Sequence, residues 1–189
     1  MKTLLKIAIE LLLVILFLSL PFETVIDQGH ECDIGPLILQ ITNKWFLEDI
    51  FGSDSIKIQR CWSDYKKGKE KIIFIDKGTQ KLLAINIKDT FSLFIKTSIS
   101  SGRGKSWTPI GEFKILKKRI SRTSKKYGGT MTYWNCITDN EKYAIHGLKD
   151  LSYESNLGRA VSHGCIRVST LVAKEIYDTV PIGTAVLID

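Results

Sequence analysis

One short segment of the chain, Ser162-His163-Gly164-Cys165-Ile166-Arg167-Val168, holds residue types from which a nucleophilic site can be built. It sets an imidazole, a glycine and a thiol beside one another. A second imidazole, that of His146, lies upstream with fifteen residues between it and Ser162. A thiol nucleophile needs a base within hydrogen-bond reach and backbone N–H groups that face an oxyanion. The pattern therefore predicts acyl transfer that depends on a cysteine.

Cys165 is the expected nucleophile of this segment. A thiol with an ordinary pKa of about 8.5 is mostly protonated at neutral pH, so a neighbouring imidazole must take its proton. His163 stands two residues before Cys165, and on an extended backbone both side chains lie on one face, so His163 could assist. The N–H groups of Gly164 and Cys165 are the expected oxyanion donors, and Gly164 has no side chain to hinder a substrate.

A zinc site is the main chemical alternative. His146, His163 and Cys165 are all zinc ligands by type, but no fourth ligand and no supporting carboxylate stands close to them in the sequence. None of the four cysteines forms a C-x-x-C pair, which argues against a zinc ribbon or a thioredoxin-like site. We therefore expect no metal and no cofactor. If the chain is exported, Cys32 and Cys61 could pair, whereas Cys136 fits a buried apolar position.

Residues 4–22 are almost all apolar, and Lys2 and Lys6 supply positive charge at that end. Such a run can cross a bilayer, which takes about 20 residues. The exit at Ser19-Leu20-Pro21-Phe22-Glu23 lacks the small-residue pattern of a cleavage site, so residues 1–22 read as an uncleaved membrane anchor rather than a cleaved signal sequence. Positive charge before the span keeps the N-terminus in the cytoplasm. We expect a membrane-anchored protein with its catalytic domain in the periplasm or otherwise outside the cytoplasmic membrane.

The rest of the chain divides into a membrane-proximal segment of unknown role, residues 23–70, and a β-rich domain, residues 71–189. In the first, Asn43 could cap a short helix that Gly52 ends. In the second, Ser169 can cap one late helix that Pro181 ends. The expected fold class is predominantly β with one late helix, a mixed α+β domain. Apolar alternation or short apolar runs indicate strands at residues 72–75, 83–87, 91–95, 112–116, 133–137, 143–145 and 185–188.

The chain is basic, with 27 Lys and Arg against 20 Asp and Glu and a net charge of +7. A basic surface suits an anionic partner such as nucleic acid, lipid headgroups or an acidic polymer, and a solvated lysine-rich face explains the charge equally well. The basic residues within 66–71 and 117–119 lack interleaved aromatic residues or a reading helix. We therefore expect no nucleic-acid binding.

Residues 71–189 resemble the catalytic domain of L,D-transpeptidases of the YkuD type. The resemblance rests first on a histidine, a spacer, then Ser-His-Gly-Cys, a hydrophobic residue and Arg, which here are His146, fifteen residues and residues 162–167. One departure is Thr132, where proline is common. The resemblance implies a YkuD-like β-sandwich or barrel. Flanking matches are Thr108-Pro109-Ile110-Gly111-Glu112-Phe113, Met131-Thr132-Tyr133-Trp134, Leu157-Gly158-Arg159-Ala160 and Pro181-Ile182-Gly183-Thr184.

The resemblance implies an enzyme that attacks the bond between the third and fourth residues of a peptidoglycan stem tetrapeptide. Terminal D-Ala leaves, a thioester forms on Cys165, and an amine of a neighbouring stem resolves it into a 3→3 cross-link. Water as the acceptor would make the same site an L,D-carboxypeptidase, and the sequence does not choose between the two. Carbapenem-type β-lactams are expected to acylate Cys165. The other alternative is a non-catalytic cell-wall-binding module, although the chain keeps the cysteine and the first histidine.

The resemblance also assigns roles to residues. His146 is the expected base, and His163 is expected beside the oxyanion site. Apart from the resemblance, the Gly147 carbonyl is expected to orient the other ring nitrogen of His146, because no Asp or Glu has an obvious claim. Arg167 would pair with a substrate carboxylate or form an ordinary surface ion pair, and Tyr133 would line the groove or belong to the core. A lysine-, serine- and glycine-rich segment, residues 117–130, is the expected mobile element over the groove. The catalytic set is Cys165, His146, His163 and Gly164, and the substrate-binding set is Arg167, Tyr133, Ser162 and Gly147.

Overall fold

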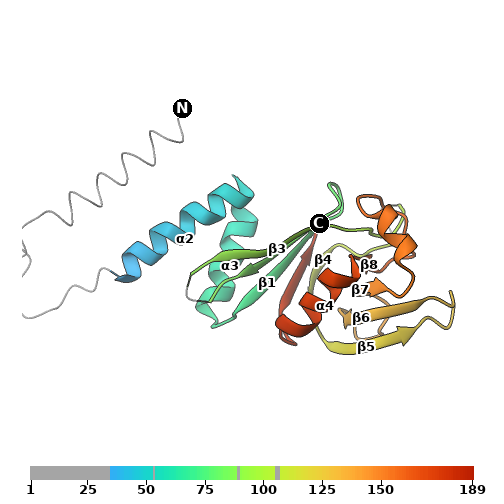
Figure 1. Cartoon of the computed structure of the whole chain (residues 1–189). Helices are drawn as coiled ribbons and strands as arrows, with labels where there is room; N and C mark the ends of the chain where they lie inside the picture. Colours follow the sequence, from blue (N-terminus) through green and yellow to red (C-terminus); the bar gives the residue numbers. More distant parts are fainter. Residues whose placement is uncertain (1–34, 53, 89, 105–106) are drawn as a thin grey trace, which may run out of the picture. The chain divides into compact units, whose positions relative to one another are not determined.

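The computed structural model describes residues 35–189, except 53, 89 and 105–106. The chain divides into two compact units, Met1–Ile41 and Thr42–Asp189. The second unit is built from two β-sheets with a late helix packed against them (Figure 1). The prediction of a mostly β domain with one late helix is confirmed for residues 71–189.

The first sheet has five strands in the order β3-β2-β1-β9-β4. The last strand of the chain, β9, lies in the middle of this sheet, parallel to β1 and antiparallel to β4. The C-terminus therefore completes the sheet that the domain's first strands begin. The strand bounds are β1 (Lys71–Asp76), β2 (Lys81–Asn86), β3 (Ser92–Ser98), β4 (Gly111–Lys114) and β9 (Ala185–Ile188).

The second sheet has four strands in the order β5-β6-β7-β8. Its first three strands are antiparallel, whereas β7 and β8 run parallel. The strand β8 is only two residues long and lies inside the motif that carries Cys165, so the motif itself is built into the sheet. The strand bounds are β5 (Lys117–Thr123), β6 (Thr130–Cys136), β7 (Ala144–Leu148) and β8 (Ile166–Arg167).

The main core joins the two sheets and the late helix α4 (Thr170–Thr179). Ile73 and Ile75 of β1 point into it, while Ile72 and Phe74 point to the opposite face of the same sheet and are buried there as well. Burial on both faces explains why residues 72–75 form a continuous apolar run rather than an alternating one. As predicted, Ser169 caps α4 by accepting a hydrogen bond from the Val172 N–H.

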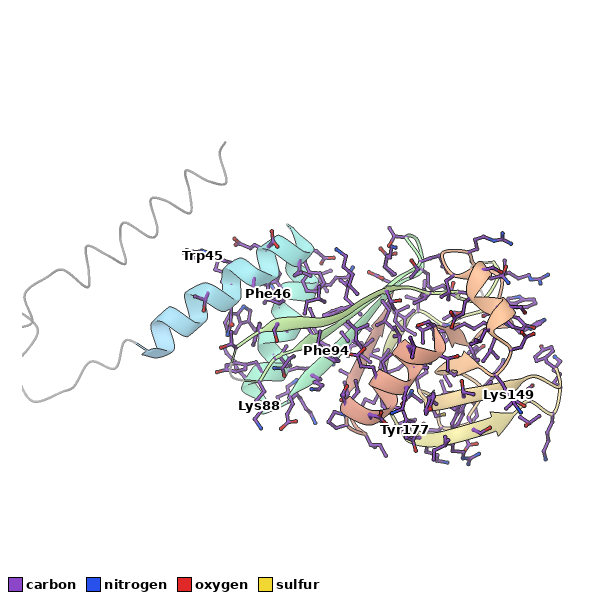
Figure 2. All side chains as sticks on the ribbon, viewed as in Figure 1. Trp45, Phe46, Lys88, Phe94, Lys149 and Tyr177 are labelled. Carbon is purple, nitrogen blue, oxygen red and sulfur yellow. The ribbon has the colours of Figure 1, made fainter. Side chains whose placement is uncertain are left out.

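Two helices cover the second face of the five-stranded sheet: residues of α2 (Gly35–Phe51) from Thr42 onward, and α3 (Ser55–Lys66). Leu47 and Cys61 are fully buried there, and Phe46 packs against the same cluster (Figure 2). The prediction that Asn43 caps a short helix is wrong, because α2 begins eight residues earlier. The residues of α2 from Thr42 onward and those of α3 therefore help to form the packed core of the β domain.

Residues 117–130 are largely a strand and not a loop. β5 pairs with β6 at residues 117–119 and 121–123, and an irregular turn joins the two strands. Lys118 of β5 reaches across to the C-terminal end of α4, where its Nζ donates to the carbonyls of Ile176, Tyr177 and Val180. A cation at this end of a helix satisfies carbonyls that lack helical partners and complements the helix dipole. This contact ties the strand to the helix.

Within the described part of the chain, no helix is long and apolar enough to span a membrane. The predicted anchor, residues 4–22, lies outside the described residues, as does Cys32. Cys61, which could pair with Cys32 if the chain is exported, is a free and fully buried thiol in α3. Cys136 is also free and buried, as predicted for an apolar position.

Candidate active site

The parallel pair β7–β8 brings the predicted base and nucleophile to one face of the sheet. Ile145 pairs with Ile166 and His146 pairs with Arg167, and both isoleucines point into the main core. Their neighbours must therefore point the other way. Cys165, directly before β8, and His146 in β7 therefore lie on the same face. Both line a cavity of about 940 Å³.

His146 is almost completely buried, with 2% of its surface exposed. Its Nδ1 lies 2.7 Å from the Gly147 carbonyl oxygen, which can only accept, so Nδ1 carries the proton and Nε2 is left as the base. This is the contact that the sequence predicts for Gly147. Burial, opposed by that hydrogen bond and assisted by the positive charge of Arg167, lowers the pKa of His146 to about 4. The imidazole is therefore neutral at physiological pH.

Gly147 must be a glycine because a side chain would have no room. A Cβ atom placed on it would lie 2.8 Å from Thr132 Oγ1 and 2.9 Å from Thr170 Cα. The close approach lets the start of α4 pack against β7 directly behind His146. The predicted role of Gly147 in substrate binding would have to use its backbone.

Cys165 is half-buried on the same face, and its Sγ lies 3.6 Å from the Lys142 carbonyl oxygen. Burial raises the pKa of its thiol, although a hydrogen bond with the Ala144 backbone and the charge of Arg167 lower it. A neutral thiol thus stands near a neutral imidazole. Proton transfer from sulfur to His146 would accompany attack on a substrate and would not precede it.

Ser162 holds the loop that carries Cys165. Its hydroxyl accepts a hydrogen bond from the Gly164 N–H at 3.0 Å and donates to the Cys165 carbonyl at 2.6 Å. The Gly164 N–H, predicted as an oxyanion donor, is thus already engaged by a side chain. Of the two predicted donors, the Cys165 N–H is the one that has no acceptor among the described residues.

Gly164 adopts a backbone conformation that side chains disfavour, with φ of +125°. A Cβ atom there would lie 2.8 Å from Tyr143 Cε1 and 3.0 Å from the Trp107 carbonyl oxygen. The position is therefore closed to larger residues on steric grounds. The sequence suggested that Gly164 lacks a side chain so that a substrate can approach. In the structure, Tyr143 and the Trp107 backbone pack so closely against the loop that only glycine fits.

Thr108 is a contact of this loop that sequence reasoning left without a role. It is fully buried, and its hydroxyl donates to the Gly164 carbonyl at 2.7 Å and accepts from the Gly102 N–H at 2.7 Å. The segment around Gly102 also pairs with the motif, through bridges from Ser100 to Arg167 and from Gly102 to Ser162. The sequence feature that could have indicated a role for Thr108 is the Thr-Pro-Ile-Gly motif that begins with it.

His163 lies at the exposed rim of the cavity between two aromatic rings. The ring of Tyr127, from the β5–β6 turn, stacks on it with centroids 4.0 Å apart, and Trp107 stacks more loosely at 6.1 Å. Partial burial, together with the charges of Arg167, Arg103 and Lys126, lowers the pKa of His163. The β5–β6 turn thus covers His163 at the edge of the site.

Arg167 lines the cavity beside His146, and its guanidinium lies 4.5 Å from the centre of the Tyr153 ring. The guanidinium is partly removed from water, and this burial lowers the pKa of Arg167. No carboxylate of the described residues forms an ion pair with it. A half-buried cation without an anion is suited to a ligand carboxylate.

The side chains of Tyr133 and Trp134 lie in different places because a β-bulge interrupts β6 at these residues. Tyr133 has a positive φ of 49°, and its ring lies against Tyr177 of α4 with centroids 5.8 Å apart. It packs against the main core and is not among the residues that line the cavity. Trp134 lines the cavity instead, with the guanidinium of Arg122 4.3 Å from the centre of its ring. The structure therefore places the neighbour of the predicted residue in the groove.

The alternative prediction was a zinc site formed by His146, His163 and Cys165. Among residues 35–189 with the stated gaps, no three His, Cys, Asp or Glu side chains gather where they could hold one metal ion. His146 directs Nδ1 to a backbone carbonyl and His163 lies between two aromatic rings. A thiol, an imidazole and a guanidinium therefore line one cavity, those of Cys165, His146 and Arg167.

This chain belongs to the YkuD family of L,D-transpeptidase catalytic domains, whose pattern it matches over residues 70–188. Among its relatives, YqjB of Bacillus subtilis, an inferred L,D-transpeptidase, is 29% identical over 128 residues, which cover 61% of this chain and 69% of YqjB. YkuD of the same organism, also an inferred L,D-transpeptidase, is 35% identical over 48% of this chain and 51% of YkuD. The chain thus spans only about half of YkuD.

Solved structures of the same fold include an L,D-transpeptidase from Mycobacterium smegmatis, with a TM-score of 0.56, 22% identity, and coverage of 64% of this chain and 58% of that one. Another is L,D-transpeptidase 3 from Mycobacterium tuberculosis in complex with a faropenem-derived adduct, with a TM-score of 0.53, 20% identity, and coverage of 64% and 60%. These similarities establish the fold.

Proposed function

We propose that this protein is a cysteine acyltransferase that acts on peptidoglycan stem tetrapeptides. The observation that carries the proposal is that Cys165 and His146 lie on one face of β7–β8, with His146 Nε2 free to act as the base. Membership of the L,D-transpeptidase family supports the substrate. The unpaired Arg167 in the same cavity is suited to a stem carboxylate.

In the proposed first step, the thiol of Cys165 attacks the carbonyl carbon between the third and fourth stem residues. The S–C bond forms as the thiol proton passes to Nε2 of His146, and the carbonyl electrons move to oxygen. The oxyanion then collapses, the C–N bond breaks, and His146 returns the proton to the leaving amine of D-Ala. A thioester on Cys165 remains.

In the second step, an amine of a neighbouring stem attacks the thioester and gives its proton to His146. The C–S bond breaks, the thiol regains its proton, and the product is a 3→3 cross-link. Water in place of the amine yields a free tripeptide by the same route, so L,D-carboxypeptidase activity is the second candidate.

The same thiol is expected to open the ring of a carbapenem and form a stable thioester. The L,D-transpeptidase LdtMt1, a solved structure of the same fold, is in complex with the carbapenem imipenem, which supports this reactivity. The site is expected to lie outside the cytoplasmic membrane, where peptidoglycan is assembled, with the apolar residues 4–22 as the anchor.

The test is to mix the full-length protein with a stem tetrapeptide and measure both the intact mass of the protein and the small products. D-Ala release with an adduct on Cys165 is expected from the wild type, and neither is expected from Cys165→Ala. His146→Ala should reduce the rate of both. Cross-linked dimers would identify a transpeptidase and free tripeptide a carboxypeptidase. A folded protein that releases no D-Ala and forms no adduct would favour a non-catalytic wall-binding module.

A further inference from the structure

We propose that Thr108 is a positioning residue that aims the Cys165 N–H at the oxyanion of the reaction. The inference rests on the proposed function, because an oxyanion forms only if Cys165 attacks a carbonyl. It assigns a task in catalysis to a side chain that lies fifty-six residues before the loop it holds.

The Thr108 hydroxyl joins two backbone segments that meet beneath the nucleophile. It donates to the Gly164 carbonyl and accepts from the Gly102 N–H, both at 2.7 Å. The side chain is fully buried, so water does not compete for either contact. Since a hydroxyl has one proton, its donation to Gly164 is fixed by this arrangement.

The planarity of the peptide bond carries this contact to the active site. In a trans peptide, the carbonyl of Gly164 and the N–H of Cys165 point in opposite directions. The Thr108 hydroxyl holds the carbonyl on its own side, and this turns the Cys165 N–H away from Thr108. No cis peptide occurs in the described residues.

Gly164 and Cys165 together have four backbone polar groups, and Ser162 engages two of them. Its hydroxyl accepts from the Gly164 N–H and donates to the Cys165 carbonyl. The one group left is the Cys165 N–H, which has no acceptor among the described residues. An oxyanion on the carbon bonded to Sγ forms next to this N–H. The loop is therefore braced by two hydroxyls so that one donor stays free.

The contribution of an oxyanion donor can be separated from that of thiol reactivity. Acylation of Cys165 passes through an oxyanion, and loss of one such donor lowers the rate by about 10²–10³-fold in other enzymes. Alkylation by iodoacetamide displaces iodide from a carbon atom and forms no oxyanion. A variant in which the Cys165 N–H is misdirected should lose acylation and keep alkylation.

The experiment uses full-length Thr108→Val, which removes the hydroxyl and keeps the shape, and Thr108→Ser, which keeps the hydroxyl. Imipenem acylation and iodoacetamide alkylation of Cys165 are followed by intact mass, and kcat and KM are measured with the stem tetrapeptide. Thr108→Val is expected to lower acylation and kcat by about 10–100-fold, with alkylation and KM within about 2-fold. Thr108→Ser should restore acylation to within about 3-fold of the wild type.

The control is Thr184→Val, which removes a buried hydroxyl just before β9 and should change neither rate. If Thr108→Val unfolds, Thr108→Ala, which also lacks the hydroxyl, is measured in its place, and circular dichroism establishes which variants are folded. An equal fall in acylation and alkylation would overturn the inference, as would no fall in either. A wild type that is alkylated but neither acylated nor active would instead overturn the proposed function and this inference together.

Discussion

The amide oxygen of Asn43 in α2 accepts a hydrogen bond from the backbone N–H of Phe91, 2.8 Å away, in a buried position just before β3. The family match begins at residue 70, so this contact joins the preceding helical segment to the catalytic domain. Leu47, one turn further along α2, is fully buried in the same cluster. The helices are part of what keeps the five-stranded sheet folded.

Substitutions in this cluster should therefore destabilise the whole domain. Leu47→Ala is expected to lower the free energy of unfolding by about 2–5 kcal/mol through loss of buried contacts. Asn43→Ala should lower it by about 1–3 kcal/mol, because the Phe91 N–H is left buried without an acceptor. Urea denaturation of the full-length protein measures both. Leu171→Ala, at a position 82% exposed on α4, is the control and should change stability by less than about 0.5 kcal/mol.

The buried His146 should make stability depend on pH. Its pKa is about 4 in the folded protein, against 6.5 for the free side chain, so between these values the unfolded chain binds a proton that the folded one does not. Stability is then fully present above pH 6.5 and is lost as the pH falls toward 4. The loss should reach about 2–3 kcal/mol at pH 4.5.

This pH effect can be assigned to one residue with His146→Asn. The Asn amide can donate to the Gly147 carbonyl as Nδ1 does, but it does not titrate. Urea denaturation of both proteins at pH 7 and pH 4.5 should show a steeper decline for the wild type. Parallel declines would mean that other groups cause the loss.

Arg167→Gln should weaken substrate binding more than it slows the chemistry. A charged hydrogen bond to a stem carboxylate is worth about 1.5–3 kcal/mol, so KM should rise about 10–100-fold while kcat stays within about 3-fold. The measurement belongs at pH 7.5 or above, because removing this charge raises the pKa of His146. Arg159→Gln, an exposed position that does not line the cavity, should behave as the wild type does.

Lys118→Met should destabilise the end of α4. The substitution keeps much of the apolar stem and removes donors to the carbonyls of Ile176, Tyr177 and Val180, at a cost of about 1–3 kcal/mol. Lys117→Met is the matched control, since Lys117 forms an exposed ion pair with Glu141 that contributes about 0–1 kcal/mol. Thermal unfolding compares the two. Equal losses of stability in the two variants would show that the contact of Lys118 with α4 contributes no more than the exposed ion pair of Lys117.

Most strands of the catalytic domain were predictable because apolar residues mark them. β5 was not, because its residues are exposed or half-buried and basic, with Ile120 exposed. Pairing with β6 and the contact of Lys118 with α4 hold it in place. α3 was missed although Ile58, Cys61, Trp62 and Tyr65 follow helical spacing and pack on the sheet.

The sequence alone determined the chemical types at the site. His146, the Ser-His-Gly-Cys motif and the spacing between them were enough to name a nucleophile, a base and a family, because these depend on residue identity. The expectation that Gly147 orients His146 was also within reach, since no carboxylate stood near.

Only the tertiary structure decided which groups are free to act. The Gly164 N–H is used by Ser162, and the Gly164 carbonyl is held by Thr108 from a distant segment. A bulge directs Trp134 and not Tyr133 into the cavity. Hydrogen-bond partners, side-chain direction and the pKa of a buried imidazole all arise from contacts between segments far apart in the chain, and local sequence patterns do not encode them.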